Sequence, residues 1–250
     1  MKKIIILAML IIAISSTSAY ELNMLVDSPT AGILQKGEAS IITKLYKNNG
    51  LVLGTKVGLF PGFMFGVSYG AEQIVGNKKP NWHERVEFSA KYRIIDEATS
   101  MPAIALGYDS QGHGEYHNSF KRYDIKSKGF YAVASKNYLF LGNIGFHLGA
   151  NVSLETKDKD DELNFFCGID KDLGNTITFI WEYDFAWNDN EDQTLDEAVE
   201  VMKHGYMNTS FDINFTDYLK LKISFYDMLK KRTDTVGSDR TLALIYNMTF

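Results

Sequence analysis

Residues 177–187 read Ile-Thr-Phe-Ile-Trp-Glu-Tyr-Asp-Phe-Ala-Trp, and their alternation indicates the fold class. Every odd position carries a large apolar or aromatic side chain, whereas the positions between them include Thr178, Glu182 and Asp184. Successive side chains of a β-strand point to opposite faces, so the pattern predicts a strand with one apolar and one polar face. Ile180 is the apolar exception on the polar face.

The same alternation recurs from residue 37 to the end of the chain and predicts twelve strands. Many of them are about 10 residues long, which is the length that a tilted strand needs to cross a bilayer. Residues 129–138 do not keep one facing, and residues 102–109 are short and contain Pro102. The predicted strands are residues 37–46, 51–60, 63–75, 85–95, 102–109, 129–138, 144–154, 163–170, 176–187, 205–215, 219–228 and 241–250.

Long and short connections alternate between these strands. In a bacterial outer-membrane barrel both termini face the periplasm, the periplasmic turns are short and the external loops are long. The connections predicted to be external are residues 47–50, 76–84, 110–128, 155–162, 188–204 and 229–240, and only the first of them is tight. The chain is therefore predicted to be all-β, a single antiparallel up-and-down transmembrane β-barrel of about twelve strands.

The beginning of the chain has the pattern of a secretory signal. Two lysines precede an apolar run over residues 4–14, and small residues follow as far as Ala19. This order is typical of a cleavable signal peptide, here residues 1–19, which predicts export across the inner membrane; together with the barrel pattern it places the mature chain in the outer membrane. Residues 20–36 lack periodicity and are predicted to be a periplasmic segment or a plug, and residues 37–250 the barrel.

Composition narrows the classes of function. The net charge of −5 provides no basic excess for phosphates, which argues against a nucleic-acid partner. Aromatic residues make up 13% of the chain and there are four prolines, which favours strands over helices. The last strand closes on Tyr246, Met248 and Phe250, an ending that resembles the C-terminal signal read by the barrel-assembly machinery.

Charged residues of the polar parity are predicted to face the lumen. At mid-membrane on the lipid side, Arg or Lys would cost about 2–4 kcal/mol each. Together with inward glycines, these charges leave two alternatives open, a narrow water-filled pore or a plugged structural lumen. The predicted lumen-facing residues are Lys56, Glu72, Arg85, Glu87, Lys91, Arg93, Asp109, Glu182, Asp184 and Asp212. The aromatic residues predicted for the interfacial girdles are Tyr46, Tyr92, Tyr138, Trp187, Tyr206, Tyr218 and Phe250.

Four groups of residues have side chains that could form a chemical site. His113, Glu115 and His117 share the longest external loop, and residues 157–162 form an acidic run; both groups are interpreted as solvated loops rather than metal sites. Residues 194–205 have the pattern of a short capped helix.

His147, next to Asn151 and Ser153 on one strand, suggests a hydrolase triad but has no supporting motif. Cys167 has an apolar parity, which indicates a buried or lipid-facing thiol.

Three stretches resemble a known family. They are Asp27–Gly32, Ile104–Gly112 and Lys128–Tyr138, and they are similar to the YjbH-like group of bacterial outer-membrane barrel proteins. The resemblance implies a link to exopolysaccharide secretion and transfers no functional residue. This chain lacks the lipoprotein cysteine that some members of the group carry.

The sequence therefore predicts a non-enzymatic outer-membrane barrel without a cofactor, either a narrow pore or a component linked to exopolysaccharide export. The expected partners are outer-membrane lipid, lipopolysaccharide, the assembly machinery, and a polysaccharide or small solute. Two alternatives stay open at this point. One is an outer-membrane enzyme acting on lipids, and the other is a soluble periplasmic β-barrel that binds an apolar ligand.

Overall fold

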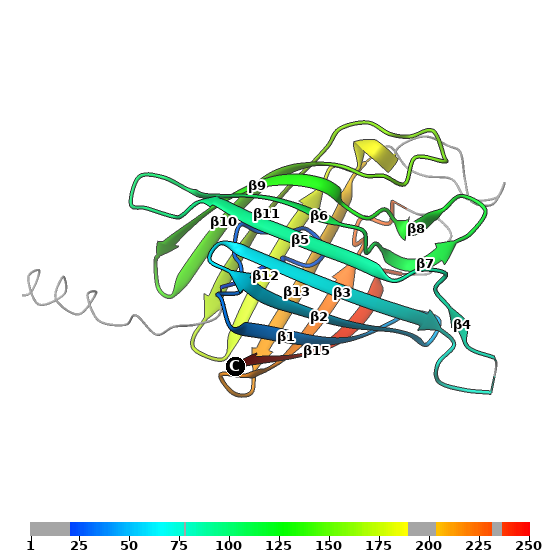
Figure 1. Cartoon of the computed structure of the whole chain (residues 1–250), viewed down its shortest axis with the longest axis horizontal. Helices are drawn as coiled ribbons and strands as arrows, with labels where there is room; N and C mark the ends of the chain where they lie inside the picture. Colours follow the sequence, from blue (N-terminus) through cyan, green and yellow to red (C-terminus); the bar gives the residue numbers. More distant parts are fainter. Residues whose placement is uncertain (1–20, 78, 190–203, 232–236) are drawn as a thin grey trace, which may run out of the picture.

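A computed structural model describes residues 21–77, 79–189, 204–231 and 237–250. Within these ranges, twelve wall strands form an antiparallel sheet that the pairing of β2 with β3 closes into a barrel, and the two-residue β4 adds to this sheet at β3 (Figure 1). The predicted all-β barrel of twelve strands is thus confirmed. Its strands are β1 Glu38–Tyr46, β2 Gly50–Phe60, β3 Phe63–Glu72, β5 Glu87–Ile95, β6 Ala103–Asp109, β9 Gly129–Leu139, β10 Asn143–Val152, β11 Asn164–Leu173, β12 Ile177–Asp184, β13 Tyr206–Asn214, β14 Leu219–Tyr226 and β15 Asp239–Thr249.

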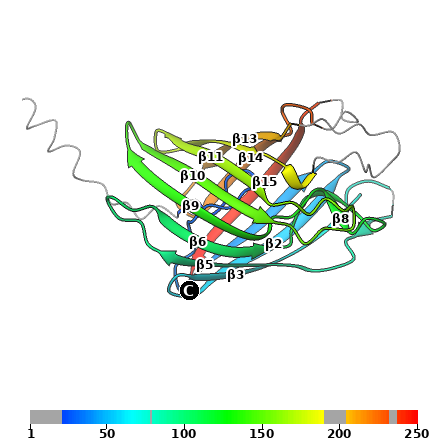
Figure 2. The same cartoon turned by 90° about the horizontal axis from the view of Figure 1, so that it is seen from above.

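The two ends of the barrel differ in the length of their connections. Short turns lie at the end that carries the C-terminus, whereas longer connections extend from the opposite end (Figures 1 and 2). The long connections contain β4 Asn81–Trp82, the pair β7 His113–His117 and β8 Arg122–Ile125, and the 3-10 helix η1 Trp187–Asp189. By the topology of bacterial barrels, the end with long connections is the external one.

Strand β9 resolves the facing that its sequence left ambiguous. Tyr131 and Val133 are buried inside the barrel, whereas Phe130 and Tyr138 are exposed on its outer surface. Gly107 on the neighbouring strand provides the space for the tyrosine, because a Cβ there would lie 2.3 Å from the Tyr131 ring. A glycine opposite a large ring is therefore what lets this aromatic side chain point inward.

Large apolar side chains cover the outer surface of the wall. Leu148, in the middle of β10, is 62% exposed, and similar residues recur on every second position of the other strands. Five of the predicted girdle aromatics are also exposed, but Tyr46 and Tyr206 are buried inside the barrel. Within the described ranges, no helix is long and apolar enough to cross a bilayer.

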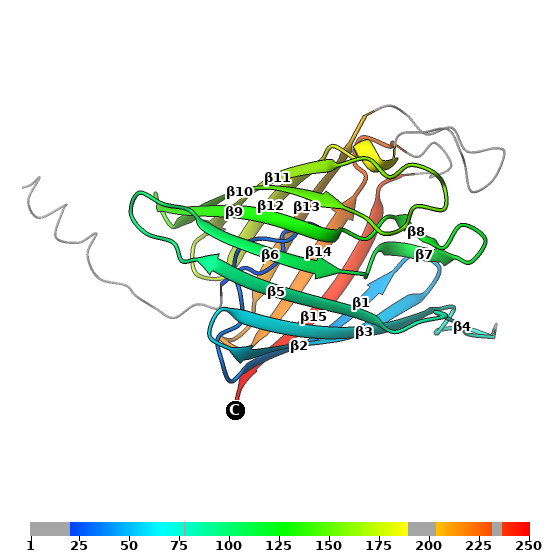
Figure 3. The ribbon, with the colours of Figure 1, turned by 45° about the horizontal axis from the view of Figure 1, so that its top comes forward.

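Residues 21–36, which we call the inner segment, run through the interior between the near and far walls of the barrel (Figure 3). Leu25 packs with Ile180, Tyr206 and Tyr226 of the wall in one apolar cluster. Further along the segment, Ala31 joins a second cluster, and Ile33 and Leu34 form a third with Met64. The apolar core of the molecule therefore lies between the inner segment and the wall.

Candidate functional site in the barrel interior

Most of the charged residues predicted to face the lumen lie on the inner face of a strand. Arg85 differs, because it precedes β5 and lies half-exposed at the external rim, 2.7 Å from Glu87. Glu72 is also at this rim, where Tyr46 donates a hydrogen bond to it over 2.7 Å and His83 lies 2.8 Å away. Those on the inner face are Lys56, Glu72, Glu87, Lys91, Arg93, Asp109, Glu182, Asp184 and Asp212.

Below the rim, the signs of charge are separated around the wall. The strands β5, β2, β1 and β14 carry the cations, whereas β11, β12 and β13 carry most of the carboxylates, and Asp109 of β6 lies between the two groups. Such a separation creates a field across the lumen. The basic arc holds Lys44, Lys56, Lys91, Arg93, Lys220 and Lys222, and the acidic arc holds Asp170, Glu182, Asp184 and Asp212.

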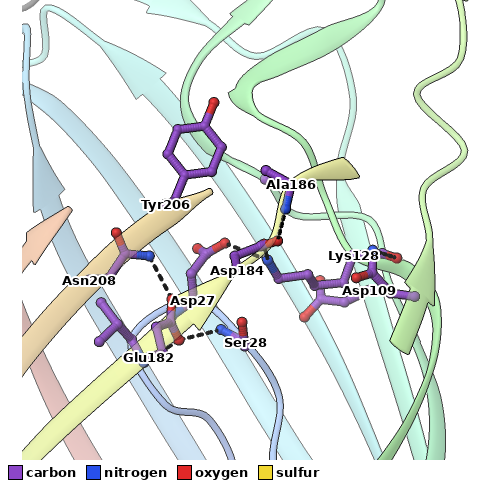
Figure 4. A network of polar contacts seen from close by, with 12 residues as sticks. Asp27, Ser28, Asp109, Lys128, Glu182, Asp184, Ala186, Tyr206 and Asn208 are labelled. Atoms are coloured by element: carbon purple, nitrogen blue, oxygen red, sulfur yellow. Dashed lines mark hydrogen bonds and ion pairs between the residues drawn. The ribbon is translucent and has the colours of Figure 1, made fainter. Parts of the chain in front are cut away.

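Glu182 anchors the inner segment. Its buried carboxylate accepts hydrogen bonds from the main-chain N–H groups of Val26, Asp27 and Ser28 over 2.9–3.1 Å, and from the Asn208 side chain over 2.7 Å (Figure 4). A turn in which the Leu25 N–H donates to Ser28 O aims the three N–H groups at one point. Consecutive N–H groups of this kind bind an anion, here a carboxylate of the wall.

On the opposite side of the segment, lysines of the basic arc bind its carbonyl oxygens. The Lys91 ammonium donates to Asn23 O, Thr30 O and Gly32 O over 2.7, 2.8 and 3.0 Å. Lys222 donates to Leu25 O in the same way. The acidic arc thus holds the amide groups of the segment, and the basic arc holds its carbonyl groups.

A second contact of the acidic arc joins the segment to the outer half of the barrel. Lys128 forms an ion pair with Asp184 and lies 3.6 Å from Asp27 (Figure 4). Asp184 also accepts hydrogen bonds from the Asn164 side chain over 2.6 Å and from the Ala186 N–H over 2.9 Å. The carboxylate is fully bonded, so this corner of the lumen is rigidly packed.

A cavity of about 170 Å³ remains between the inner segment and the basic arc. The wall carries small side chains there: Lys56 pairs with Ser40 and Gly66, and Gly66 pairs with Ser89. Cavity-lining residues include Met24 and Asp27 of the segment and the four lysines 44, 56, 220 and 222 of the wall. Its size and the charged groups in its lining allow water or a small solute to occupy it.

The external end is covered by the hairpin of β7 and β8, residues 113–125, which we call the cap hairpin. It is attached to β6 and β9, yet the His113 ring stacks on Tyr226 of β14 at 3.7 Å and lies 2.9 Å from Asp239 of β15. Counted round the ring from β6, β14 is the sixth strand in either direction. On the near side, the Tyr123 hydroxyl donates to Glu87 over 2.9 Å. The cap hairpin therefore crosses the whole mouth.

Charged residues of the other loops hold the cap hairpin in place. Arg122 donates to Asp158 over 2.6 Å and to Asp189 over 2.9 Å, and both carboxylates keep it charged by raising its pKa against the effect of burial. Glu155 accepts from the Tyr123 N–H over 3.1 Å. Burial raises the pKa of Glu155 to about 7, although hydrogen bonds from Tyr123 and Ser127 act in the opposite direction.

The histidines of the long loop point to separate carboxylates. His113 pairs with Asp239, and His117 lies 2.9 Å from Asp124. Burial and the nearby Lys44 ammonium lower the pKa of His113 despite its bond to Asp239. Among the described residues, no three His, Cys, Asp or Glu side chains converge as metal ligands.

The acidic run 157–162 is not simply solvated, because Asp158 is buried against Arg122 and Lys126.

His147 belongs to a trio that differs from the one its sequence suggested. Its Nδ1 lies 2.8 Å from Ser135 Oγ and its Nε2 lies 2.7 Å from Asp170 Oδ1, with the three residues on β9, β10 and β11. Ser135 Oγ also accepts a hydrogen bond from the Ala31 N–H over 2.8 Å. The buried serine thus contacts the inner segment, so we interpret the trio as a third anchor of that segment.

Other sequence-based sites lie away from the lumen or outside the described residues. Cys167 is half-buried on the outward parity of β11. Residues 194–203 of the predicted short helix lie outside the described ranges. Tyr246 and Met248 are exposed on β15, the strand that pairs with β1, and the Phe250 N–H donates to Gly37 O over 2.8 Å. Their role as an assembly signal stays a prediction.

Comparison with known proteins relates the chain to porins by fold. No protein-family model and no curated protein matches the sequence. Among solved structures, the KdgM porin matches with a TM-score of 0.52 at 10% identity, covering 85% of this chain and 99% of the porin. The Acinetobacter baumannii outer-membrane protein Omp33 matches with a TM-score of 0.46 at 9% identity, covering 85% of this chain and 97% of Omp33. The chain therefore has the closed barrel fold of the KdgM porin.

Proposed function

We propose that the chain spans the outer membrane and forms a narrow channel for small polar solutes, which the inner segment and the cap hairpin close in the state described. One observation carries the proposal: the interior is lined by separated charges and holds a cavity with charged side chains in its lining instead of a continuous dry core. A wall that served only to support a packed interior would not need buried lysines facing a cavity, because burying such charges is costly.

The outer surface supports the location. Its exposed apolar side chains would be in contact with water in a soluble protein, whereas in a bilayer they would face lipid. This observation argues against the alternative of a soluble periplasmic barrel. Lipid and lipopolysaccharide are then the expected surroundings, with the assembly machinery as the partner during insertion.

The closure is reversible in this proposal, because hydrogen bonds and ion pairs hold much of the inner segment. Its anchors are Glu182, Ser135, Lys91 and Lys222 on the wall. Detachment exchanges each of these bonds for bonds to water, so its net cost per bond is about 1–3 kcal/mol. Brief openings of a mostly closed channel are the expected behaviour.

Single-channel recording in planar bilayers tests the proposal. The wild type should show rare openings, and Glu182→Gln should open about 30-fold more often, since a loss of about 2 kcal/mol in anchoring corresponds to that factor. Glu162→Gln, at an exposed glutamate of an external loop, is the matched control and should behave as the wild type. Silence of both the wild type and Glu182→Gln, in preparations whose heat-modifiable migration shows folded barrels, would contradict the proposal.

A role in exopolysaccharide export, implied by the resemblance to the YjbH-like group, stays a prediction. A polysaccharide chain needs a continuous path, and the inner segment occupies the centre of the lumen. Such export would therefore require the whole inner segment to leave the barrel, whereas small solutes need only local detachment beside the cavity.

A further inference from the structure

We propose that the basic arc is a binding site for a small, multiply charged anion, and that the carbonyl groups of the inner segment occupy this site in the closed state. The inference deepens the proposed function and depends on its lumen. It assigns the chemical class of the solute, and it makes that solute a competitor of the inner segment.

Two lysines of the basic arc lie close together on the wall. Lys44 and Lys222 both pair with Ala243 of β15, one from each side, so two cations flank a single small residue. Neighbouring strands lie about 4.8 Å apart, so the two Cα atoms are separated by about 10 Å across the sheet. Long flexible lysine side chains can converge over this distance on one ligand with several negative groups.

In the closed state, neutral groups are the main partners of the lysines of the basic arc. In the described part of the chain, Lys44, Lys56 and Lys91 have no carboxylate within ion-pair distance, and Lys222 has only Asp212 at 3.7 Å. Lys44 is 3.3 Å from the Tyr226 hydroxyl, and Lys56 contacts the Met24 sulfur at 2.9 Å. Neutral oxygen and sulfur atoms thus solvate ammonium groups that an anion would bind more strongly.

Detachment of the inner segment removes these neutral partners. When the inner segment leaves, Lys91 loses three carbonyl oxygens and Lys222 loses one, while the cavity that Lys222 lines widens. Lys44, Lys56 and Lys91, which have no carboxylate within ion-pair distance in the described structure, then face water together with Lys222. An anion that binds only this detached state stabilises it in proportion to 1 + [L]/Kd, so the anion favours opening.

Thiol labelling of the inner segment provides the test. Ser28→Cys in a Cys167→Ala background puts one thiol on the segment, and Ser28 is suitable because its buried hydroxyl has no hydrogen-bond partner within the described structure. The neutral reagent N-ethylmaleimide should label this thiol only when the segment detaches. Citrate is the anionic probe; sucrose and a potassium chloride solution of equal ionic strength are the controls.

Citrate at about ten times its dissociation constant should speed labelling about 10-fold, whereas sucrose and potassium chloride should not. In the same background, Lys91→Gln with Lys222→Gln should raise the basal labelling rate and abolish the effect of citrate. Lys79→Gln, at an exposed lysine of an external loop, should keep the effect. Labelling that ignores citrate in the wild-type lumen, or that responds equally in the double variant, would overturn the inference.

Labelling requires no current, so the two proposals fail separately. A barrel that conducts but does not respond to citrate would refute the anion site alone. A barrel that is silent in bilayers but responds to citrate would refute the channel and retain the anion site.

Discussion

At the scale of single residues, Glu182 has the largest expected effect on the inner segment. Its carboxylate accepts three main-chain N–H groups, whereas a glutamine would present an amide N–H₂ on one side of the same turn. Glu182→Gln should therefore increase hydrogen exchange at the amides of Val26 and Ser28 by about 30-fold, for a loss of about 2 kcal/mol. Mass spectrometry of the protein in micelles measures this, and unchanged protection would exclude Glu182 as an anchor.

Glu155 gives the cap hairpin a dependence on pH. Its folded pKa of about 7 lies above the ordinary value of 4.5, so the folded cap binds more protons between pH 4.5 and 7. The stabilisation that Glu155 gives the cap is therefore complete below pH 4.5 and is lost as pH rises through 7, by up to about 3 kcal/mol. Exchange of the Tyr123 amide, corrected for its intrinsic rate, should accelerate from pH 5 to pH 8.

The variant Glu155→Gln serves as the control for this pH effect, because it carries no titratable proton and should show the same corrected Tyr123 exchange rate at both pH values. A pH response that persists in the variant would assign the effect to another group, such as His113.

Residue parity could be predicted from the sequence, but contacts between strands could not. Lys44 and Lys222 have the same inward parity as Lys56, so the alternation contained the signal needed to find them. Ser135 carried no such signal. Neighbours of one facing along a strand lie about 7 Å apart, whereas direct neighbours across strands are about 5 Å apart. The register therefore pairs His147 with Ser135 and not with Asn151 of its own strand.

At the scale of elements, the inner segment behaves as a unit whose mobility decides whether the channel opens. The Ala31 N–H lies 2.8 Å from Ser135 Oγ, so cysteines at these two positions are within reach of a disulfide. Ala31→Cys with Ser135→Cys, in a Cys167→Ala background, should abolish openings when oxidised and restore them on reduction. Either single cysteine variant is the control, and current through the oxidised pair would contradict the role of the segment.

The twelve wall strands could be predicted because most of them repeat a period of two over about eight to eleven residues. The inner segment has no period, since its residues contact opposite walls through the main chain as well as through side chains. β7 and β8 were missed for a similar reason: they are short, and the contacts that hold their hairpin in place reach strands far away in the sequence, such as the one between His113 and Tyr226.

At the scale of the whole molecule, the apolar outer belt predicts a depth-dependent cost for charge. Leu148→Arg puts a cation near the middle of β10, and its insertion should cost about 2–4 kcal/mol. Leu163→Arg, exposed in an external loop, should cost little and is the matched control. The two variants are folded into lipid vesicles at increasing urea concentrations, and heat-modifiable migration on a gel measures the folded fraction of each. Equal folding of both variants would place Leu148 outside the bilayer.

The bond between the Phe250 N–H and Gly37 O has a consequence for how the molecule is assembled. Gly37 joins the inner segment to β1, and Phe250 directly follows β15, the strand that pairs with β1. The inner segment therefore enters the barrel where the first and last strands meet. Before β1 and β15 pair, the growing sheet can curl around the inner segment without obstruction. After β1 and β15 have paired, the segment would have to pass through the narrow end of the barrel. We therefore expect the sheet to enclose the segment before these two strands pair.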